Sequence, residues 1–183
     1  MDFISTFKFL IEKFNHEKID FAIIGGLALQ FSGITRTTLD IDFLVLGEDS
    51  SKVKDIMLKK GYNLIHESED VLNFVSDKPD FGRVDFLLAH RKYSVSMLKR
   101  AEKKEVFAGK LTVKVLKIED QIGLKVQSSS NDPQRMHQDM ADIELLIKHS
   151  YPNLDLAILK EYFGLFERAK QLNEILERIK NAE

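Results

Sequence analysis

The sequence predicts an α+β protein that ends in a helical bundle. Short apolar runs bounded by turn residues recur as far as position 117, a pattern typical of strands interleaved with helices. From Ile118 onward the strand signals vanish and apolar residues recur at helical spacing. We therefore expect an α+β core over residues 1–117 and a helical C-terminal region, packed on that core, over residues 118–183.

The elements of the core follow from apolar spacing and turn residues. An opening amphipathic helix is predicted from the spacing of Phe7, Leu10, Ile11 and Phe14. Further helices are predicted at 27–31 and 50–60, the second ended by Gly61, and a turn at Lys78-Pro79-Asp80. The expected strands are 20–24, 39–46, 62–66, 71–75 and 83–89, followed by a short basic helix and a hairpin of 105–107 with 111–116.

The C-terminal region is predicted to be helical throughout. Apolar positions at helical spacing indicate four segments there. The run Ser128-Ser129-Ser130-Asn131-Asp132-Pro133 suggests an altered loop between the first and second of them. The expected helices are 118–127, 132–148, 153–163 and 165–181.

The composition limits the chemistry. Of 183 residues, 44% are hydrophobic, enough for a core, and cysteine is absent, which excludes disulfides, thiolate catalysis and Cys-ligated zinc. The N-terminus lacks the pattern of a secretory signal, and no apolar stretch approaches the roughly 20 residues of a membrane span. We expect a soluble, cytoplasmic protein without a membrane partner.

The most informative motif is a glycine pair followed by two alternating aspartates. Gly25 and Gly26 end one apolar strand, and Asp40 and Asp42 begin the next. Residues i and i+2 of a strand point to the same face, so the two carboxylates project together. Asp85 lies in a second apolar run, and its carboxylate joins the pair if the two strands are neighbours.

Three neighbouring carboxylates predict a metal site. Carboxylates this close repel each other unless a cation lies between them. Mg²⁺ prefers carboxylate and phosphate oxygens, and the cluster of Asp40, Asp42 and Asp85 could hold two such ions. One would bind a nucleoside triphosphate and the other would activate an acceptor hydroxyl, whose proton Asp85 is the best candidate to accept.

The glycines have a separate predicted role. Without side chains at Gly25 and Gly26, a phosphate can approach the backbone amides and the N-terminus of the following helix. Arg36 either steadies a phosphate or caps a loop. Glycine pairs and Asp-x-Asp pairs also occur at ordinary turns and on surface strands. Three aspartates in apolar runs favour the metal–nucleotide interpretation, because unpaired buried carboxylates are costly.

These residues resemble the signature of the DNA polymerase β-like nucleotidyltransferase superfamily. The form Gly25-Gly26-Leu-Ala-Leu with Arg36-x-Thr-x-Asp40-Ile-Asp42 looks most like the abortive-infection toxin (AbiEii-type) branch, and the resemblance spans residues 21–147. It implies a nucleotidyltransferase fold, with a mixed β-sheet flanked by helices. It also implies Mg²⁺-dependent transfer of a nucleoside monophosphate with release of pyrophosphate. Asp40 and Asp42 would ligate the metal, with Asp85 as the third carboxylate.

The same branch has a later helical motif, matched here by Lys125, Arg135, Asp139 and Asp142. The resemblance implies that Lys125 contacts the triphosphate. Asp139 would lie near the nucleotide or orient Lys125. Read from the residues alone, Lys125 is a surface helix residue, and the two aspartates form an ordinary surface ion pair with Arg135.

The acceptor is the open part of the prediction. In the toxin branch it includes RNA and tRNA ends, and an antitoxin protein is a frequent partner. Residues 91–117 carry nine basic and two acidic residues, a net charge of +7 that suits a polyanion. We therefore expect an ATP- or GTP-binding enzyme acting on RNA in a toxin–antitoxin setting. The alternatives are an antibiotic nucleotidyltransferase, with an acceptor pocket near Tyr62, Glu67, Glu69 and Tyr93, or a non-catalytic nucleotide-binding or antitoxin-like module.

Overall fold

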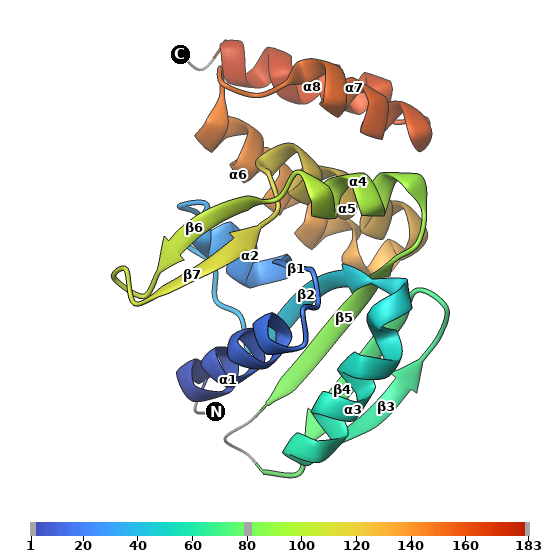
Figure 1. The fold of residues 1–183 in the computed structure, drawn as a ribbon. Helices are drawn as coiled ribbons and strands as arrows, with labels where there is room; N and C mark the ends of the chain where they lie inside the picture. The colour runs from blue at the N-terminus through green and yellow to red at the C-terminus, as the bar shows by residue number, and fades with distance from the viewer. Residues whose placement is uncertain (1–2, 79–81, 182–183) are drawn as a thin grey trace. The chain divides into compact units, whose positions relative to one another are not determined.

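The chain divides into two compact units, Met1–Leu116 and Lys117–Glu183, shown as a computed structural model in Figure 1. The structure describes residues 3–78 and 82–181. The turn predicted at Lys78-Pro79-Asp80 lies largely outside the described residues. Within the described ranges, no helix combines the length and apolar character needed to cross a membrane.

The first unit is the predicted α+β part, and its elements confirm the predicted fold class. The hairpin begins earlier than the apolar pattern indicated, because its first strand is a polar edge strand that pairs on one side only. The elements are α1 (Phe3–His16), β1 (Phe21–Ile23), α2 (Gly25–Phe31), β2 (Asp40–Leu46), the 3₁₀ helix η1 (Gly47–Asp49), α3 (Ser50–Lys60), β3 (Tyr62–Glu67), β4 (Val71–Ser76), β5 (Arg83–Ala89), α4 (Lys92–Lys99), β6 (Glu102–Val106) and β7 (Leu111–Val115).

The strands form one mixed seven-stranded sheet in the order β3-β4-β5-β2-β1-β7-β6. The pairs β2–β5 and β1–β7 are parallel, and the remaining neighbours are antiparallel. The β2–β5 pair runs in unbroken register from Asp40 opposite Arg83 to Leu46 opposite Ala89. The two aspartate-bearing strands are therefore neighbours at the centre of the sheet.

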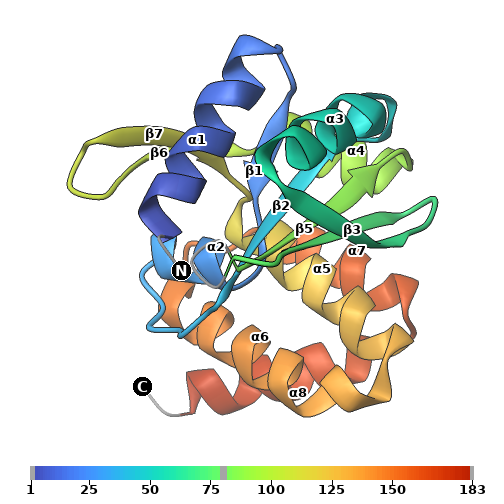
Figure 2. The ribbon, with the colours of Figure 1, turned by 90° about the horizontal axis from the view of Figure 1, so that it is seen from below.

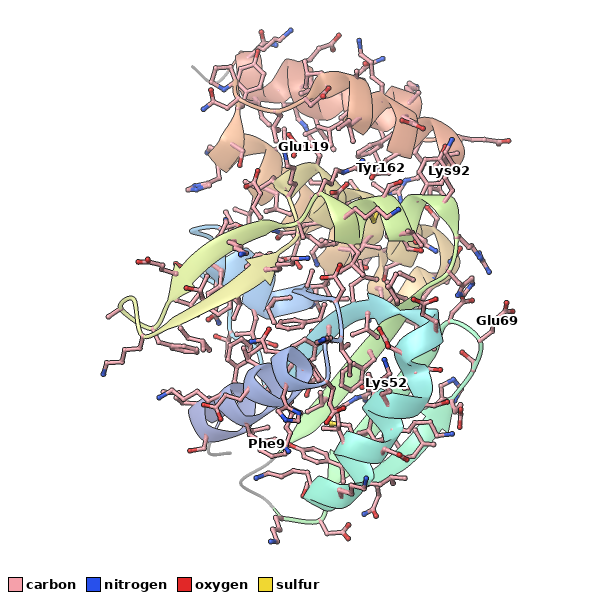
Figure 3. The ribbon with its side chains drawn as sticks, in the orientation of Figure 1. Phe9, Lys52, Glu69, Lys92, Glu119 and Tyr162 are labelled. Carbon is pink, nitrogen blue, oxygen red and sulfur yellow. The ribbon has the colours of Figure 1, made fainter. Side chains whose placement is uncertain are left out.

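One face of this sheet carries an aromatic core. Phe43 of β2 stacks on Phe86 of β5 with ring centroids 5.4 Å apart, and Phe14 of α1 meets Phe43 edge-on at 5.2 Å. Figures 1 and 2 show α1 and α3 on the same side of the sheet, and both helices contribute to this core. Phe9, labelled in Figure 3, lies on α1 with the Lys60 ammonium 4.1 Å from its ring centroid. Side chains alternate along a strand, so residues 40, 42 and 85 lie on the opposite face.

The second unit is helical, as predicted. Its packing joins α5 to α6 and α7, and α7 to α8. The helices are α5 (Ile118–Asn131), the 3₁₀ helix η2 (Pro133–Arg135), α6 (Met136–Ser150), α7 (Leu156–Leu165) and α8 (Ala169–Lys180).

The loop predicted at 128–133 is wrong over its first four residues, because α5 continues through the serines. The hydroxyls of Ser129 and Ser130 donate back to the Val126 carbonyl oxygen at 3.1 and 2.7 Å, which keeps these polar side chains within the helix. The Arg168 guanidinium donates to both hydroxyls, at 2.6 and 3.1 Å. This tertiary contact offsets the weak helix preference of the serine run.

Gly123 of α5 leaves room for the ring of Tyr162, which joins α5 to α7. The hydroxyl of Tyr162, a residue labelled in Figure 3, donates to buried Asp120 at 2.6 Å. A Cβ atom at Gly123 would lie 2.6 Å from the Tyr162 ring. We expect Gly123→Ala to lower the free energy of unfolding by about 1–3 kcal/mol, measured by urea denaturation.

Gly164→Ala is the matched control, because Gly164 is also helical and a Cβ atom there would meet nothing within 4 Å. That variant is expected to be neutral or stabilised by up to about 1 kcal/mol. Equal effects of the two substitutions would contradict the packing role of Gly123.

Candidate active site

The parallel pairing of β2 and β5 brings the three predicted aspartates to one face of the sheet. Asp42 and Asp85 are register partners on neighbouring strands, and Asp40 lies two residues before Asp42 on the same face. All three are half-buried. Ile41 and Phe43 point into the core as predicted, with no exposed surface.

Gly25 lies against the carboxylate of Asp42. Its φ of +63° is in the left-handed region, and a Cβ atom there would lie 2.1 Å from Oδ2 of Asp42. The Ile24 amide, one residue earlier, donates to the Asp42 carbonyl oxygen at 3.0 Å. The glycine is therefore required both by the backbone conformation and by the close approach of the aspartate.

Gly26 has a similar role toward the loop that precedes β2. A Cβ atom there would lie 2.6 Å from Cβ of Thr38, whose hydroxyl donates to the Asp40 carbonyl oxygen at 3.2 Å. The sequence predicted that these glycines leave space for a phosphate. In the structure, Asp42 and Thr38 lie where Cβ atoms of Gly25 and Gly26 would be, so the glycines also make room for the site's own side chains. The approach of a phosphate to their backbone amides stays a prediction.

Two polar side chains hold Asp85. The Asn73 amide donates to Oδ1 at 2.7 Å, and Arg83 Nε lies 2.9 Å from Oδ1 and 2.8 Å from Oδ2. Neither Asn73 nor Arg83 was predicted from the sequence. Arg83 could have been found, because it precedes Asp85 by two residues and shares its strand face. Asn73 could not, because it reaches Asp85 through the pairing of β4 with β5.

The electrostatics of the site favour a cation. Burial raises the pKa of Asp40, the negative charge of Asp85 raises it further, and Arg83 partly opposes this. The hydrogen bond to Asp85 raises the pKa of Arg83, with added contributions from the charges of Asp85, Asp40 and Asp42. The charge of Asp85 therefore disfavours the charged form of Asp40, and a positive charge nearby relieves the repulsion.

The donor set fits Mg²⁺ in its chemistry. Carboxylate oxygens are the ligands this ion prefers, and Asp40 and Asp42 project from one strand face. Asp85 would join them only by sharing a carboxylate oxygen that Arg83 now contacts. Across the described ranges, no group of three or more Asp, Glu or His side chains is already close enough to hold a metal ion.

Arg36 lies in the loop between α2 and β2. Its carbonyl oxygen accepts a hydrogen bond from the Gln30 side-chain amide, which ties the loop to the end of α2. The residue is half-buried. Its predicted contact with a phosphate stays a prediction.

The second unit contains a buried charged cluster at the predicted helical motif. Lys125 Nζ of α5 lies 3.2 Å from Asp139 and 2.7 Å from Asp142, both on α6. The aspartate side chains are only 1% and 5% exposed, so the interpretation of Asp139 and Asp142 as a surface ion pair is wrong. Arg135 Nε lies 3.5 Å from Asp139 Oδ2, in ion-pair range but without a hydrogen bond.

Removing the lysine would leave two buried carboxylates without their main cation. We expect Lys125→Met to lower the free energy of unfolding by about 2 kcal/mol, because buried charges that lose a partner keep their desolvation cost. Urea denaturation measures the effect. Lys148→Met on the exposed side of α6 is the control and should change stability by less than about 0.5 kcal/mol. Equal effects would show that the cluster is not a stabilising contact.

The family comparison assigns the chain to the class of nucleotidyltransferases. The chain belongs to the family described as nucleotidyl transferase of unknown function (DUF2204), whose profile matches residues 4–181. The protein is therefore an enzyme, a nucleotidyltransferase, and the non-catalytic alternative is set aside. No curated protein matches the sequence.

Solved structures with a similar fold include antibiotic-modifying enzymes. The antibiotic-resistance factor ANT(2'')-Ia in solution is 16% identical, with a TM-score of 0.65 over 98% of this chain and 97% of that chain. The same enzyme in complex with adenylyl-2''-tobramycin is also 16% identical, with a TM-score of 0.64 over 90% of this chain and 96% of that chain. The lincomycin-bound lincosamide adenylyltransferase LnuA is 15% identical, with a TM-score of 0.58 over 78% of this chain and 94% of that chain. At these identities the likeness shows the fold.

The comparisons confirm the predicted nucleotidyltransferase superfamily. They give no specific support to the AbiEii-type branch, and the similar structures reported above carry the names of antibiotic-modifying enzymes. The AbiEii-type branch therefore stays a prediction.

Proposed function

We propose that the protein transfers a nucleoside monophosphate from a Mg²⁺-bound nucleoside triphosphate to a hydroxyl group of a small hydroxylated molecule. The observation that carries this proposal is the register pairing of Asp42 with Asp85, with Asp40 on the same face. Three carboxylates on adjacent strands suit a divalent cation and an attacking hydroxyl at neighbouring positions.

The residues would divide the chemistry between them. Asp40 and Asp42 would hold Mg²⁺, which when bound supplies neutralisation of the triphosphate charge and polarisation of the α-phosphate. Gly25 would fix the Asp42 carboxylate by packing against it. Asp85 would be the third carboxylate of the metal site. It would also orient the acceptor hydroxyl and receive its proton at the carboxylate oxygen that the metal leaves free, while Asn73 keeps the carboxylate in place. Catalysis would rest mainly on such positioning.

The assignments of Gly25, Gly26, Arg36, Lys125 and Asp139 to nucleotide binding stay predictions. Gly26 and Arg36 belong to the segment that surrounds the start of β2. Lys125 and Asp139 form an ion pair within the second unit, which is consistent with Asp139 orienting the lysine.

The basic segment 91–117 is less available to a polyanion than its charge indicates. Lys104 Nζ donates to the Phe31 carbonyl oxygen at 3.2 Å, and Lys114 forms an ion pair with Asp20. Arg91 lies 3.4 Å from Asp70. Several of these charges therefore support the fold. Together with the antibiotic-modifying neighbours, this favours a small acceptor over the RNA acceptor first predicted, and nothing in the comparisons points to an antitoxin partner.

A labelled-transfer assay tests the proposal. Each nucleoside triphosphate, labelled at the α-phosphate, is incubated with the protein, Mg²⁺ and separate acceptor pools of aminoglycosides, lincosamides or total tRNA. We expect label on a small hydroxylated acceptor, accompanied by pyrophosphate and abolished by EDTA. Label on tRNA alone would instead support the RNA acceptor. Transfer that persists in EDTA would contradict the assignment of Mg²⁺.

A further inference from the structure

Arg83 occupies a position that the nucleotidyltransferase chemistry leaves unexplained. It lies two residues before Asp85 on β5, on the same face of the sheet, and it is the register partner of Asp40 on β2. Its Nε lies 2.9 and 2.8 Å from the two oxygens of Asp85. A positive charge therefore already lies beside the carboxylates proposed to bind the divalent cation.

We propose that Arg83 is a built-in counter-ion: it contacts Asp85 in the metal-free protein and competes with the divalent cation for that carboxylate. The inference rests on the proposed function, because it takes Asp85 as part of the metal site. Arg83 is thus a positioning residue whose release accompanies loading of the metal.

The contacts of Asp85 show why the two cations would compete. Oδ1 accepts from Asn73 at 2.7 Å as well as from Arg83, whereas Oδ2 contacts only Arg83 within the described part of the chain. Asn73 anchors one oxygen from the neighbouring strand β4, so the carboxylate cannot simply turn away from Arg83. A metal ion would therefore take Oδ2, and Arg83 would have to give up that contact.

The exposure of Arg83 indicates that it can be displaced. Its side chain is 45% exposed, whereas that of Asp85 is 20% exposed. Half-exposed ion pairs are weak, because water competes for the guanidinium and ordering the long side chain costs entropy. A divalent cation with two or three carboxylate ligands binds the site more strongly than a single guanidinium does. It would therefore displace the guanidinium of Arg83 from Asp85.

The first test measures metal affinity directly. Mn²⁺, used in place of Mg²⁺, is titrated into the full-length protein, and free Mn²⁺ is followed by electron paramagnetic resonance. We expect Arg83→Gln to bind Mn²⁺ about two- to fivefold more tightly than the wild type, the effect of removing a weak competing ion pair. Arg83→Lys keeps the charge without the planar fork and is expected to fall between the two.

Arg91→Gln is the matched control. It removes the same charge from an arginine that is 66% exposed and paired with Asp70 instead of a site carboxylate. We expect its Mn²⁺ affinity to equal that of the wild type. Wild-type affinity in Arg83→Gln, weaker affinity, or an equal gain in Arg91→Gln would overturn the inference while leaving the proposed function intact. Absence of Mn²⁺ binding by the wild type, with and without nucleotide, would overturn both.

Thermal unfolding supplies a readout that a purely structural arginine would not produce. Without Arg83, the carboxylates of Asp40, Asp42 and Asp85 repel one another when no metal is present, whereas bound Mg²⁺ neutralises them. Arg83→Gln is therefore expected to lower the Tm more in EDTA than in saturating Mg²⁺. An equal loss of Tm in both conditions would indicate a structural role alone and would contradict the inference.

Discussion

Asp42→Asn is expected to lower the rate of nucleotide transfer about a thousandfold, since losing a metal ligand removes several kcal/mol of transition-state stabilisation. Asp42 lies at the centre of the site, because it pairs with Asp85 across the strands and contacts Gly25. Asparagine has nearly the same shape but lacks the charge. The fold should therefore survive, and the loss should appear in kcat at saturating nucleotide and metal.

Asp70→Asn is the control for the loss of one carboxylate. Asp70 is half-exposed and pairs with His90 at 3.1 Å and with Arg91, away from the Asp42–Asp85 pair. We expect it to keep wild-type activity within about twofold, as for most surface substitutions. Activity of Asp42→Asn within tenfold of the wild type, with an unchanged Tm, would show that this carboxylate does not bind the catalytic metal.

Gly25→Ala is expected to have the second largest effect. The added Cβ atom would lie 2.1 Å from Oδ2 of Asp42, and the φ of +63° disfavours any L side chain. The backbone strain costs about 1–2 kcal/mol of stability. The carboxylate would also have to move by an amount of the order of an ångström, and such a displacement lowers activity about a hundredfold.

Gly61→Ala separates these two effects. Gly61 has a φ of +88°, so alanine is strained there too, but a Cβ atom would meet nothing within 4 Å. We expect this variant to lose stability and to keep its kcat. Equal losses of kcat in the two variants, measured well below their Tm, would mean that Gly25 acts only through backbone strain.

The sequence revealed the parts of the site that local periodicity determines. Residues Asp40 and Asp42 alternate with Ile41 and Phe43, and this period alone assigned the carboxylates to one face and the apolar residues to the core. The run around Asp85 gave the second strand with its observed bounds, Arg83–Ala89. Local alternation could not show that β2 and β5 are neighbours, which the sheet order establishes.

Residues that act through long-range contacts were missed. Asn73 reaches Asp85 only because β4 lies beside β5, and the serine run of α5 stays helical because Arg168 contacts it from the start of α8. The side chain that lies against Gly25 was also not predicted. The predicted approach of a phosphate to its backbone amide stays a prediction, and the structure adds that Asp42 lies where a Cβ atom of Gly25 would be. A single sequence does not state which side chain approaches a glycine.

The most direct test of the metal site is a crystal structure with Mn²⁺ and non-hydrolysable analogues of the four nucleoside triphosphates in turn. The account predicts an anomalous peak bonded to the carboxylates of Asp40 and Asp42 and to Oδ2 of Asp85, with the triphosphate on its far side and Arg83 moved away from that oxygen. A bound triphosphate without a peak at Asp40 or Asp42, or a peak elsewhere in the chain, would contradict it.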